Sequence, residues 1–533
     1  MRKQSWVRKL SGLSLLLLTS PALAQTEVGA KAPEAPTPAV AVESAQPSTA
    51  ASAQGVAAEP AAANQGVSAP RPAVSPSPVH VPESTPAPAP PQRAPVGLAP
   101  LESGPAAMKG KWNPTFYGFV AVDLVHDSTQ SLATGSPGYL LIARPGTYAA
   151  KHGRTVFDAR GTRFGFRLAA PETDGMKATG VIEADFLGSQ LPVNYGTSPT
   201  GISEGTYYGS GLLRIRHAAL KIESPYVDIL MGQYWQLYGW MPLYLPVSVQ
   251  VPGLPGAPFG RNLQFRVSHT FKTAPVSVEV ALAAVRPPAR NAEYPDAQGG
   301  ARLMVNRWRG VSAAGGTGAA FVEMPAGLGV SAVYRRLKVP EFAAAPSKQK
   351  SVDGRGLSVD VFLPVIPSHL NHKGNALNVS GSFSVGQAIG DLYSPGVPGG
   401  AGFPALPNPS GTAPAPTWPQ DIDNGLVTYD LAGGIHAIKW RTGLAGIQYY
   451  LPPSGRVWVA ANYGFAKSTN LADFDLAPEK IVTKYTLWDG LVYVNVVGPI
   501  TIAAEFAREK QTYGDGKVAK NNRLMMSGYY SFW

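Results

Sequence analysis

The sequence predicts an all-β protein: a transmembrane antiparallel β-barrel of about 16 strands, preceded by a disordered Pro/Ala-rich segment. Three observations lead to this prediction: an export signal at the start, a long stretch without aromatic residues, and a remainder that alternates between apolar and polar residues. The 533 residues are 44% hydrophobic and only 15% charged. They include no cysteine, which excludes a disulfide framework and thiolate chemistry.

Residues 1–24 are the predicted signal peptide. Four basic residues precede an apolar stretch centred on residues 15–18, and Ala22-Leu23-Ala24 form a small-residue cleavage pattern before Gln25. The apolar stretch is too short to span a bilayer, and no later stretch offers about 20 uninterrupted apolar residues. The mature protein is therefore expected to be exported, and to use strands if it spans a membrane.

Residues 25–109 form the predicted disordered tether. No Phe, Trp or Tyr occurs between residues 25 and 108, so this part cannot bury enough apolar surface to offset its ordering entropy. Pro-rich chains extend by about 3.1 Å per residue, so roughly 80 residues reach on the order of 250 Å. The simplest interpretation is a passive periplasmic spacer, and the alternative is a segment that binds the cell wall or a periplasmic partner.

The barrel domain is expected over residues 110–533, where period-two alternation recurs. In residues 177–188, Ile182 and Phe186 lie on one face of the predicted strand, and Glu183 and Asp185 on the other. Residues 162–170, 262–270 and 327–336 alternate in the same way. A soluble sandwich would alternate too, but the lack of a large hydrophobic core and the aromatics near strand ends favour an outer-membrane barrel.

The strand number follows from the length of this domain. Residues 110–533 number 424. At roughly 25 residues per strand with its turns, they make 16 or 17 strands, and bacterial barrels prefer even numbers. An even number places both ends of the domain on the periplasmic side. A barrel of this size is too wide for side chains to fill, so a water-filled channel is expected.

The last segment, NRLMMSGYYSFW, has the same alternation. Its closing aromatics suit a bilayer interface, where amphipathic rings are favoured. It is also similar to the strand that outer-membrane assembly machinery reads, although Trp rather than Phe stands last. The predicted outward residues are Leu524, Met526, Gly528, Tyr530 and Phe532, and the predicted inward ones are Arg523, Met525, Ser527, Tyr529, Ser531 and Trp533.

Several blocks of the sequence together resemble the DcaP-like outer-membrane porins. The blocks are FYGF, TRFGFRLAAP, VIEADFLG, LLRIRHAAL, ILMGQYW, GRNLQFRVSH and GQAIGDLY, in the order seen in that family, followed by the closing VGPITIAAEFAREKQTYGDGK. The resemblance spans most of residues 110–533. It implies a homotrimer of barrels, each of about sixteen strands, that admits small anions, notably dicarboxylic acids.

Two features depart from that family. Its periplasmic N-terminal extension is usually helical and coiled-coil-like, whereas residues 25–109 are rich in Pro and Ala, which puts a coiled-coil trimerisation role in question. The stretch from about Ser394 to Asn424 is a candidate insertion, expected as an extracellular loop.

The charge balance predicts an anion preference. Residues 1–24 hold four basic residues and residues 25–108 hold three basic and six acidic ones, which leaves 38 basic and 28 acidic residues for the remainder. Fixed positive charge in a pore favours anions, and arginine binds carboxylates with two hydrogen bonds. Alternatively, several of the arginines pair with Glu183, Asp185, Glu279 or Glu505, or bind anionic lipid at the rims. The candidate pore-lining and anion-binding residues are Arg163, Arg167, Arg214, Arg216, Arg266, Arg335, Arg523, Glu183 and Asp185.

Arg214 and Arg216 are the most specific candidates. They stand two residues apart, so on a strand they share a face, about 7 Å apart, with Leu213, Ile215 and Ala219 opposite. Two arginines facing lipid would cost roughly 2–4 kcal/mol each, so both are expected to point inward.

Other functions have less support in the sequence. Neither G-x-S-x-G nor H-E-x-x-H occurs, and His369 and His372 stand in a predicted turn, so no enzyme, cofactor or metal is expected. A gated transporter would need about 22 strands and a folded plug, and the export signal disfavours nucleic acid. The expected function is passive diffusion of small hydrophilic solutes through the outer membrane. The alternatives are a structural tether to the cell wall and, less favoured, a barrel hydrolase.

Overall fold

The computed structural model describes most of the predicted barrel domain. The described residues are 111–130, 142–188, 211–240, 255–287, 292, 294–314, 320–342, 346–394, 425–430, 432–474, 478–479 and 481–532. The predicted signal peptide and tether, residues 395–424 of the predicted insertion, and Trp533 lie outside them.

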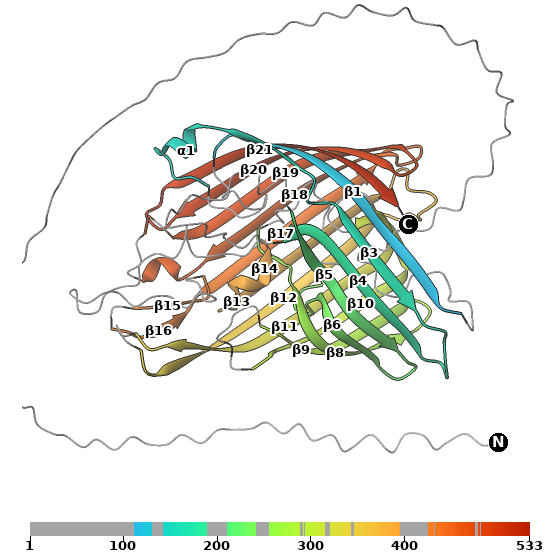
Figure 1. The fold of residues 1–533 in the computed structure, drawn as a ribbon, viewed down its shortest axis with the longest axis horizontal. Coiled ribbons are helices and arrows are strands. Elements are labelled where there is room, and N and C mark those ends of the chain that lie inside the picture. Colours follow the sequence, from blue (N-terminus) through green and yellow to red (C-terminus); the bar gives the residue numbers. More distant parts are fainter. Residues whose placement is uncertain are drawn as a thin grey trace, which may run out of the picture. The chain divides into compact units, whose positions relative to one another are not determined.

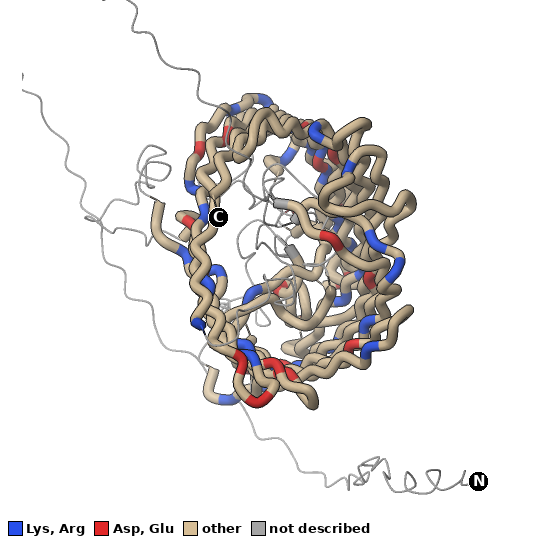
Figure 2. The backbone as a smooth tube through the Cα atoms, turned by 90° about the vertical axis from the view of Figure 1, so that its right-hand side faces the viewer, with Lys and Arg blue, Asp and Glu red and all other residues tan. Residues whose placement is uncertain are grey.

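The described chain forms one closed antiparallel barrel (Figures 1 and 2). Each wall strand pairs with the next along the chain, and β21 pairs with β1 to close the ring. Because β2 and β3 both pair with β1, they are two parts of one wall strand, and the 17 strands of the sheet fill 16 positions. The prediction of about sixteen strands is confirmed.

The wall strands are β1 (Asn113–Asp127), β2 (Arg154–Asp158), β3 (Arg163–Ala169), β4 (Lys177–Gly188), β5 (Leu212–Glu223), β6 (Asp228–Trp235), β8 (Arg261–Lys272), β9 (Val276–Val285), β10 (Asp296–Ala314), β11 (Ala320–Pro340), β12 (Gln349–Ile366), β13 (Leu377–Gln387), β17 (Lys439–Tyr450), β18 (Val457–Ser468), β19 (Val482–Val497), β20 (Ile500–Tyr513) and β21 (Val518–Phe532). The shorter elements are α1 (Tyr148–Lys151), β7 (Ala257–Pro258), η1 (Gly390–Leu392), β14 (Tyr393–Ser394), β15 (Val427–Tyr429), β16 (Ile435–Ala437) and η2 (Leu471–Asp473). None of the helices in the described residues is long and apolar enough to cross a membrane.

The barrel is apolar outside and polar inside. On β4, Ile182 is 61% exposed, whereas its neighbour Glu183 is only 4% exposed. On β21, Leu524 and Met526 are exposed while Arg523 and Met525 are buried, as the alternation of NRLMMSGYYSF predicts. A period of two sends successive side chains to opposite faces, so each strand contributes to both surfaces. An apolar outer face around a polar interior is the pattern of barrels that stand in lipid.

The two ends of the barrel differ in their connections. At one end, called the short-turn end, the strands are joined by turns such as 170–176, 224–227 and 498–499. At the other, called the long-loop end, the connections include 128–153, 236–260 and 388–438. β1 begins and β21 finishes at the short-turn end.

One long loop turns inward and is hydrogen-bonded to the inner wall. The backbone N–H of Tyr238 donates to Gln298 Oε1 at 2.7 Å, and that of Gly239 donates to Ser331 Oγ at 2.7 Å. The N–H of Trp240 donates to Asp360 Oδ2 at 3.2 Å. Because these donors have no strand partner, the side chains of three wall strands satisfy them.

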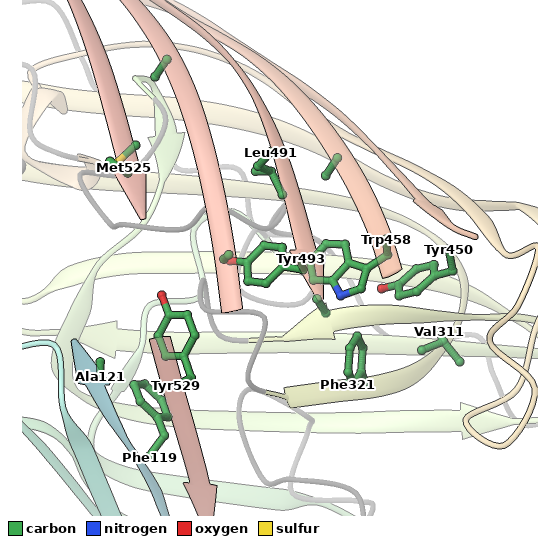
Figure 3. Close-up of a cluster of buried hydrophobic side chains, with 14 of the residues drawn as sticks. Phe119, Ala121, Val311, Phe321, Tyr450, Trp458, Leu491, Tyr493, Met525 and Tyr529 are labelled. Atoms are coloured by element: carbon green, nitrogen blue, oxygen red, sulfur yellow. The ribbon is translucent and has the colours of Figure 1, made fainter. Parts of the chain in front are cut away.

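A second inward element is formed where β10 ends and β11 begins, with side chains such as Val311 and Phe321 (Figure 3). The Ala313 N–H donates to Gln448 Oε1 at 3.2 Å, and the Phe321 ring packs edge-on against Tyr450 and Trp458. Trp458 in turn stacks on Tyr493, with ring centroids 4.2 Å apart. The inward aromatics therefore form a local hydrophobic cluster beside these ends of β10 and β11.

Candidate functional site

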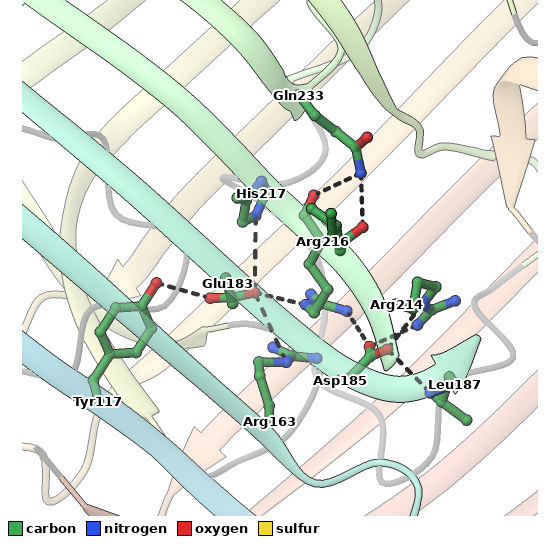
Figure 4. A network of polar contacts seen from close by, with 10 residues as sticks. Tyr117, Arg163, Glu183, Asp185, Leu187, Arg214, Arg216, His217 and Gln233 are labelled. Carbon is green, nitrogen blue, oxygen red and sulfur yellow. Dashed lines mark hydrogen bonds and ion pairs between the residues drawn. The ribbon is translucent and has the colours of Figure 1, made fainter. Parts of the chain in front are cut away.

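Five of the predicted site residues meet on the inner wall as one cluster, named here the β3–β5 ion-pair cluster (Figure 4). Arg216 Nε lies 2.6 Å from Glu183 Oε1, and Arg216 Nη1 lies 3.1 Å from Asp185 Oδ2. Arg214 Nη2 lies 2.7 Å from the same Asp185 oxygen, and Arg163 Nε lies 3.9 Å from Glu183. Three guanidinium groups therefore surround two carboxylates.

Cross-strand register explains why these side chains meet. Arg163 on β3 stands opposite Asp185 on β4, and Asp185 stands opposite Arg214 on β5. Directly opposed residues of an antiparallel pair have Cβ atoms about 5 Å apart, within reach of an arginine–carboxylate pair. Arg214 and Arg216 share the inner face, as their spacing predicts.

A β-bulge changes the side-chain alternation just after Arg216. The pairing of β4 with β5 shifts between Glu183 and Ala184, so Arg216 and His217 are both buried. A bulge inserts one extra residue and reverses the inside–outside order beyond it. The expectation that Ala219 lies on the outer face with Ile215 is therefore wrong, since Ala219 pairs with inward Val181.

Tyr117 on β1 completes this cluster. Its hydroxyl donates to Glu183 Oε2 at 3.1 Å, so Glu183 accepts hydrogen bonds from neighbours on both sides. The ring lies over Gly165, where a Cβ atom would stand 2.3 Å from the ring. Glycine at residue 165 is therefore what allows Tyr117 to reach the carboxylate.

Further arginines extend the positive charge along the same arc of wall. Arg266 donates to the Trp235 carbonyl at 2.6 Å and to Gln264 at 3.0 Å, and Arg302 pairs with Glu279 at 2.5 Å. Arg167 is buried on the inner face of β3. These arginines and their carboxylates are named here the basic arc: Arg163, Arg167, Arg214, Arg216, Arg266 and Arg302 with Glu183, Asp185 and Glu279. Arg261 on β8 lies beside this set, over the Trp235 ring, whereas Lys221 pairs separately with Glu223 and Asp228 near the short-turn end.

A second arc carries the opposite charge. Five buried inward carboxylates lie on β1, β19 and β20, and Arg523 of β21 pairs with one of them, Asp127, at 2.7 Å. Asn521 donates to both Asp127 and Glu509, at 2.7 and 3.0 Å. These carboxylates are named here the acidic arc: Asp123, Asp127, Asp489, Glu505 and Glu509. The candidate residues did not include them, although the alternation along these strands already indicated that they point inward.

The remaining candidate, Arg335, is neutralised by two carboxylates. Its side chain is fully buried between Asp296 at 3.0 Å and Asp391 at 2.5 Å. Asp391 belongs to η1, so this arginine joins the wall to the inward part of the loop at 388–394. Of the seven candidate arginines, Arg163, Arg214 and Arg216 form one cluster with Glu183 and Asp185, whereas Arg335 and Arg523 belong to separate ion pairs.

Comparison with solved structures relates this barrel to a known channel. The chain is similar to the outer membrane channel DcaP of Acinetobacter baumannii, with 18% identity over 80% of this chain and 100% of that one, and a TM-score of 0.53. The chain has the fold of DcaP. It is also similar to an anion-selective porin from Comamonas acidovorans, with 10% identity, 79% and 100% coverage and a TM-score of 0.40. For OprB of Pseudomonas putida, identity is 11%, coverage 79% and 94%, and the TM-score 0.41. No protein-family model and no curated protein matches the sequence.

Much of the positive charge of this DcaP-like barrel lies on its outer face. Exposed outward basic residues occur on β17, β18, β19, β20 and β21 near the long-loop end, such as Arg441 and Lys484. The excess of basic residues counted from the sequence is therefore divided between the lumen and the outer surface.

The two histidines with metal-like spacing lie in the turn between β12 and β13. His369 and His372 form an isolated bridge, and His369 Nδ1 lies 3.2 Å from Glu323 Oε1. Across the described residues of this DcaP-like barrel, no three His, Cys, Asp or Glu side chains gather as a metal site would require.

Proposed function

We propose that this protein is an outer-membrane channel through which small hydrophilic solutes diffuse passively. The observation that carries this proposal is the closed 16-position barrel with an apolar outer face and charged inner arcs. The fold shared with the channel DcaP supports it. The barrel would stand in outer-membrane lipid with residues 25–109 in the periplasm, and the family resemblance implies a homotrimer. The chemistry is passage rather than catalysis.

The basic arc is the proposed source of a preference for anions such as dicarboxylates. A guanidinium group binds a carboxylate with two hydrogen bonds, and a wall that carries several guanidinium groups offers partners for both acidic groups of a dicarboxylate. Arg214 supports this role best, since its side chain is 36% exposed while that of Arg216 is 6% exposed. The acidic arc limits the proposed anion preference to the side of the lumen that the basic arc lines, because the lumen is not positive throughout.

Planar-bilayer recording of the purified protein tests both parts of the proposal. A channel would give discrete conductance steps, and an anion preference would give a reversal potential of the corresponding sign across a KCl gradient. Adding a small dicarboxylate should produce transient current blocks or a measurable permeability. Detergent-purified protein without any conductance would contradict the channel, and cation selectivity would contradict the anion preference alone.

A structural tether to the cell wall is the second candidate, and the composition of residues 25–109 is the observation in its favour. The two functions are separable by deleting residues 25–108 and keeping the signal peptide. A channel whose arm is a spacer should insert and conduct as the full chain does, since the deleted part has no aromatic residue to contribute to packing. A barrel hydrolase is the least favoured alternative.

A further inference from the structure

The outer face of β17–β21 carries a concentrated set of cations near the long-loop end. All six side chains point outward, and five of them are exposed, while Arg508 is half-buried. They are named here the basic outer patch: Arg441, Lys467, Lys484, Arg508, Lys510 and Lys520.

Strand register places these cations against one another. Arg441 stands directly opposite Lys467, and Lys467 stands opposite Lys484. Lys510 stands opposite Lys520 on the next strand pair. Like charges in directly opposed positions destabilise a sheet, so the barrel alone does not explain this arrangement.

No carboxylate of these strands compensates the patch. Asp489, Glu505 and Glu509 are the acidic residues of β17–β21, and all three are buried on the inner face. The outer face of these five strands, as described, therefore holds no acidic residue beside the six cations, nor beside Lys439 at the start of β17. The positive charge is available to an anion from outside the chain.

Elsewhere on the outer face of the barrel, a basic residue at the long-loop end is paired with an acidic one. On β11 and β12, outward Arg336 stands opposite Asp353, and the two groups lie 3.8 Å apart. This cation at the long-loop end of the outer face therefore has an acid on the neighbouring strand, which the described strands do not supply for the basic outer patch.

The centre of the patch is a hollow of about 500 Å³. Four cations line it, and the Nε atom of Arg508 is buried there without a hydrogen-bond partner. Two threonines add hydroxyl groups, and the remaining lining is aromatic and aliphatic. The lining residues are Tyr463, Lys484, Thr486, Trp488, Arg508, Lys510, Thr512, Val518 and Lys520.

Toward the middle of the barrel, the surface below the cations becomes apolar. Trp488 stands opposite Arg508 and packs against Phe506, with ring centroids 5.7 Å apart. Leu524 and Met526 continue the exposed apolar surface on β21. A ligand that suits both parts has phosphate groups at one end and hydrocarbon chains at the other, because ammonium and guanidinium groups bind phosphate strongly.

We propose that the basic outer patch binds a phosphorylated, multiply acylated glycolipid of the outer leaflet, the lipid A part of lipopolysaccharide. The phosphates would lie in the hollow among Lys484, Arg508 and Lys510, and the acyl chains would run along Trp488 and Phe506. This inference rests on the outer-membrane location proposed above, but it does not depend on which solute the channel passes.

Native mass spectrometry of the detergent-purified protein tests the inference with added bisphosphorylated lipid A. The patch variant is K484Q/K510Q/K520Q, and the matched control is R336Q/K338Q/R355Q, which removes three outward basic residues from β11 and β12 at the same end. Wild type and control are expected to retain the lipid at least tenfold better than the patch variant. Lipid A without its phosphates should bind the wild type only weakly. Its retention should equal that of bisphosphorylated lipid A on the patch variant.

Three results would overturn the inference. Equal retention by the patch and control variants would place the lipid elsewhere. Full displacement by millimolar inorganic phosphate would reduce the site to a simple anion site. A change of oligomeric state in the patch variant alone would make this face an interface between copies. Heat-modifiable migration of every variant checks folding. Conductance of the same samples separates failure of the lipid site from failure of the channel.

Discussion

Asp127 on β1 and Arg523 on β21 form a buried ion pair across the seam where the barrel closes. Arg523 Nε lies 2.7 Å from Asp127 Oδ1, and both side chains are 3% exposed or less. The two residues are 396 positions apart in the chain but directly opposed in the sheet. The pair therefore joins the first and last strands at their long-loop ends.

Breaking this pair is expected to weaken barrel closure. Removing one partner of a buried ion pair leaves the other charge unsatisfied and costs about 3–5 kcal/mol. Arg523→Ala and Asp127→Ala should each lower the temperature at which the unboiled band converts to the unfolded one on a gel. The double variant should lose less than the sum of the single losses, since neither charge is then stranded. Additive losses would contradict a direct coupling between the two residues.

The two arginines of β5 are expected to respond differently to neutralisation. Arg214→Gln should retain the fold and shift the reversal potential toward cations, because its side chain is 36% exposed and lies on the basic arc. Arg216→Gln should instead destabilise the barrel, since it removes the closest guanidinium of buried Glu183 and one of the two that contact Asp185. Arg355→Gln, on the outer face of β12, removes the same charge outside the lumen. An equal shift for Arg214→Gln and Arg355→Gln would exclude Arg214 from the ion pathway.

Gly329 is expected to control the position of the inward loop. A Cβ atom at this residue would stand 2.1 Å from Trp240 Cδ1, so Gly329→Val must push the indole away from the wall. The displaced loop would occupy more of the lumen, and single-channel conductance should fall. Gly490→Val is the matched control, because a Cβ atom there meets no atom within 4 Å. Unchanged conductance in the Gly329 variant would show that this loop does not bound the solute path.

A loop contact at the long-loop end should depend on pH. Arg144 Nη2 lies 2.5 Å from Asp515 Oδ2, and this hydrogen bond holds the pKa of the Asp515 carboxyl below its ordinary value of 3.8. A lowered carboxyl pKa means that the contact is fully present above pH 3.8 and is lost as the pH falls through the lower folded value. Asp515→Asn should remove it at every pH, which hydrogen exchange of residues 142–147 at neutral pH would measure.

The control for this loop contact is Asp430→Asn, in the turn between β15 and β16. Asp430 also has a lowered pKa, through its hydrogen bond with His436, but belongs to a different loop. Its substitution should leave exchange of residues 142–147 unchanged. Equal acceleration by both variants would indicate a general loosening of the loops rather than loss of the Arg144 contact.

The sequence alone determined the fold class, the strand number and the direction of most side chains. These features are local, because alternation with period two assigns each residue of a strand to one face. The exposed Leu524 and buried Arg523 on β21 illustrate this, since neither assignment requires knowledge of the neighbouring strand. Strand number followed from length, because each crossing uses a similar number of residues.

Only the tertiary structure decided which charges meet. Asp127 and Arg523 are paired by closure of the ring, and Arg216 lies between Glu183 and Asp185 because of the register of β4 against β5. A single bulge at this register reversed the face of Ala219, and no local pattern marked it. Pairing between strands depends on relative position along the sheet, which the composition of one strand does not encode. For that reason the inward arginines were predictable, whereas their partners and the separate acidic arc were not.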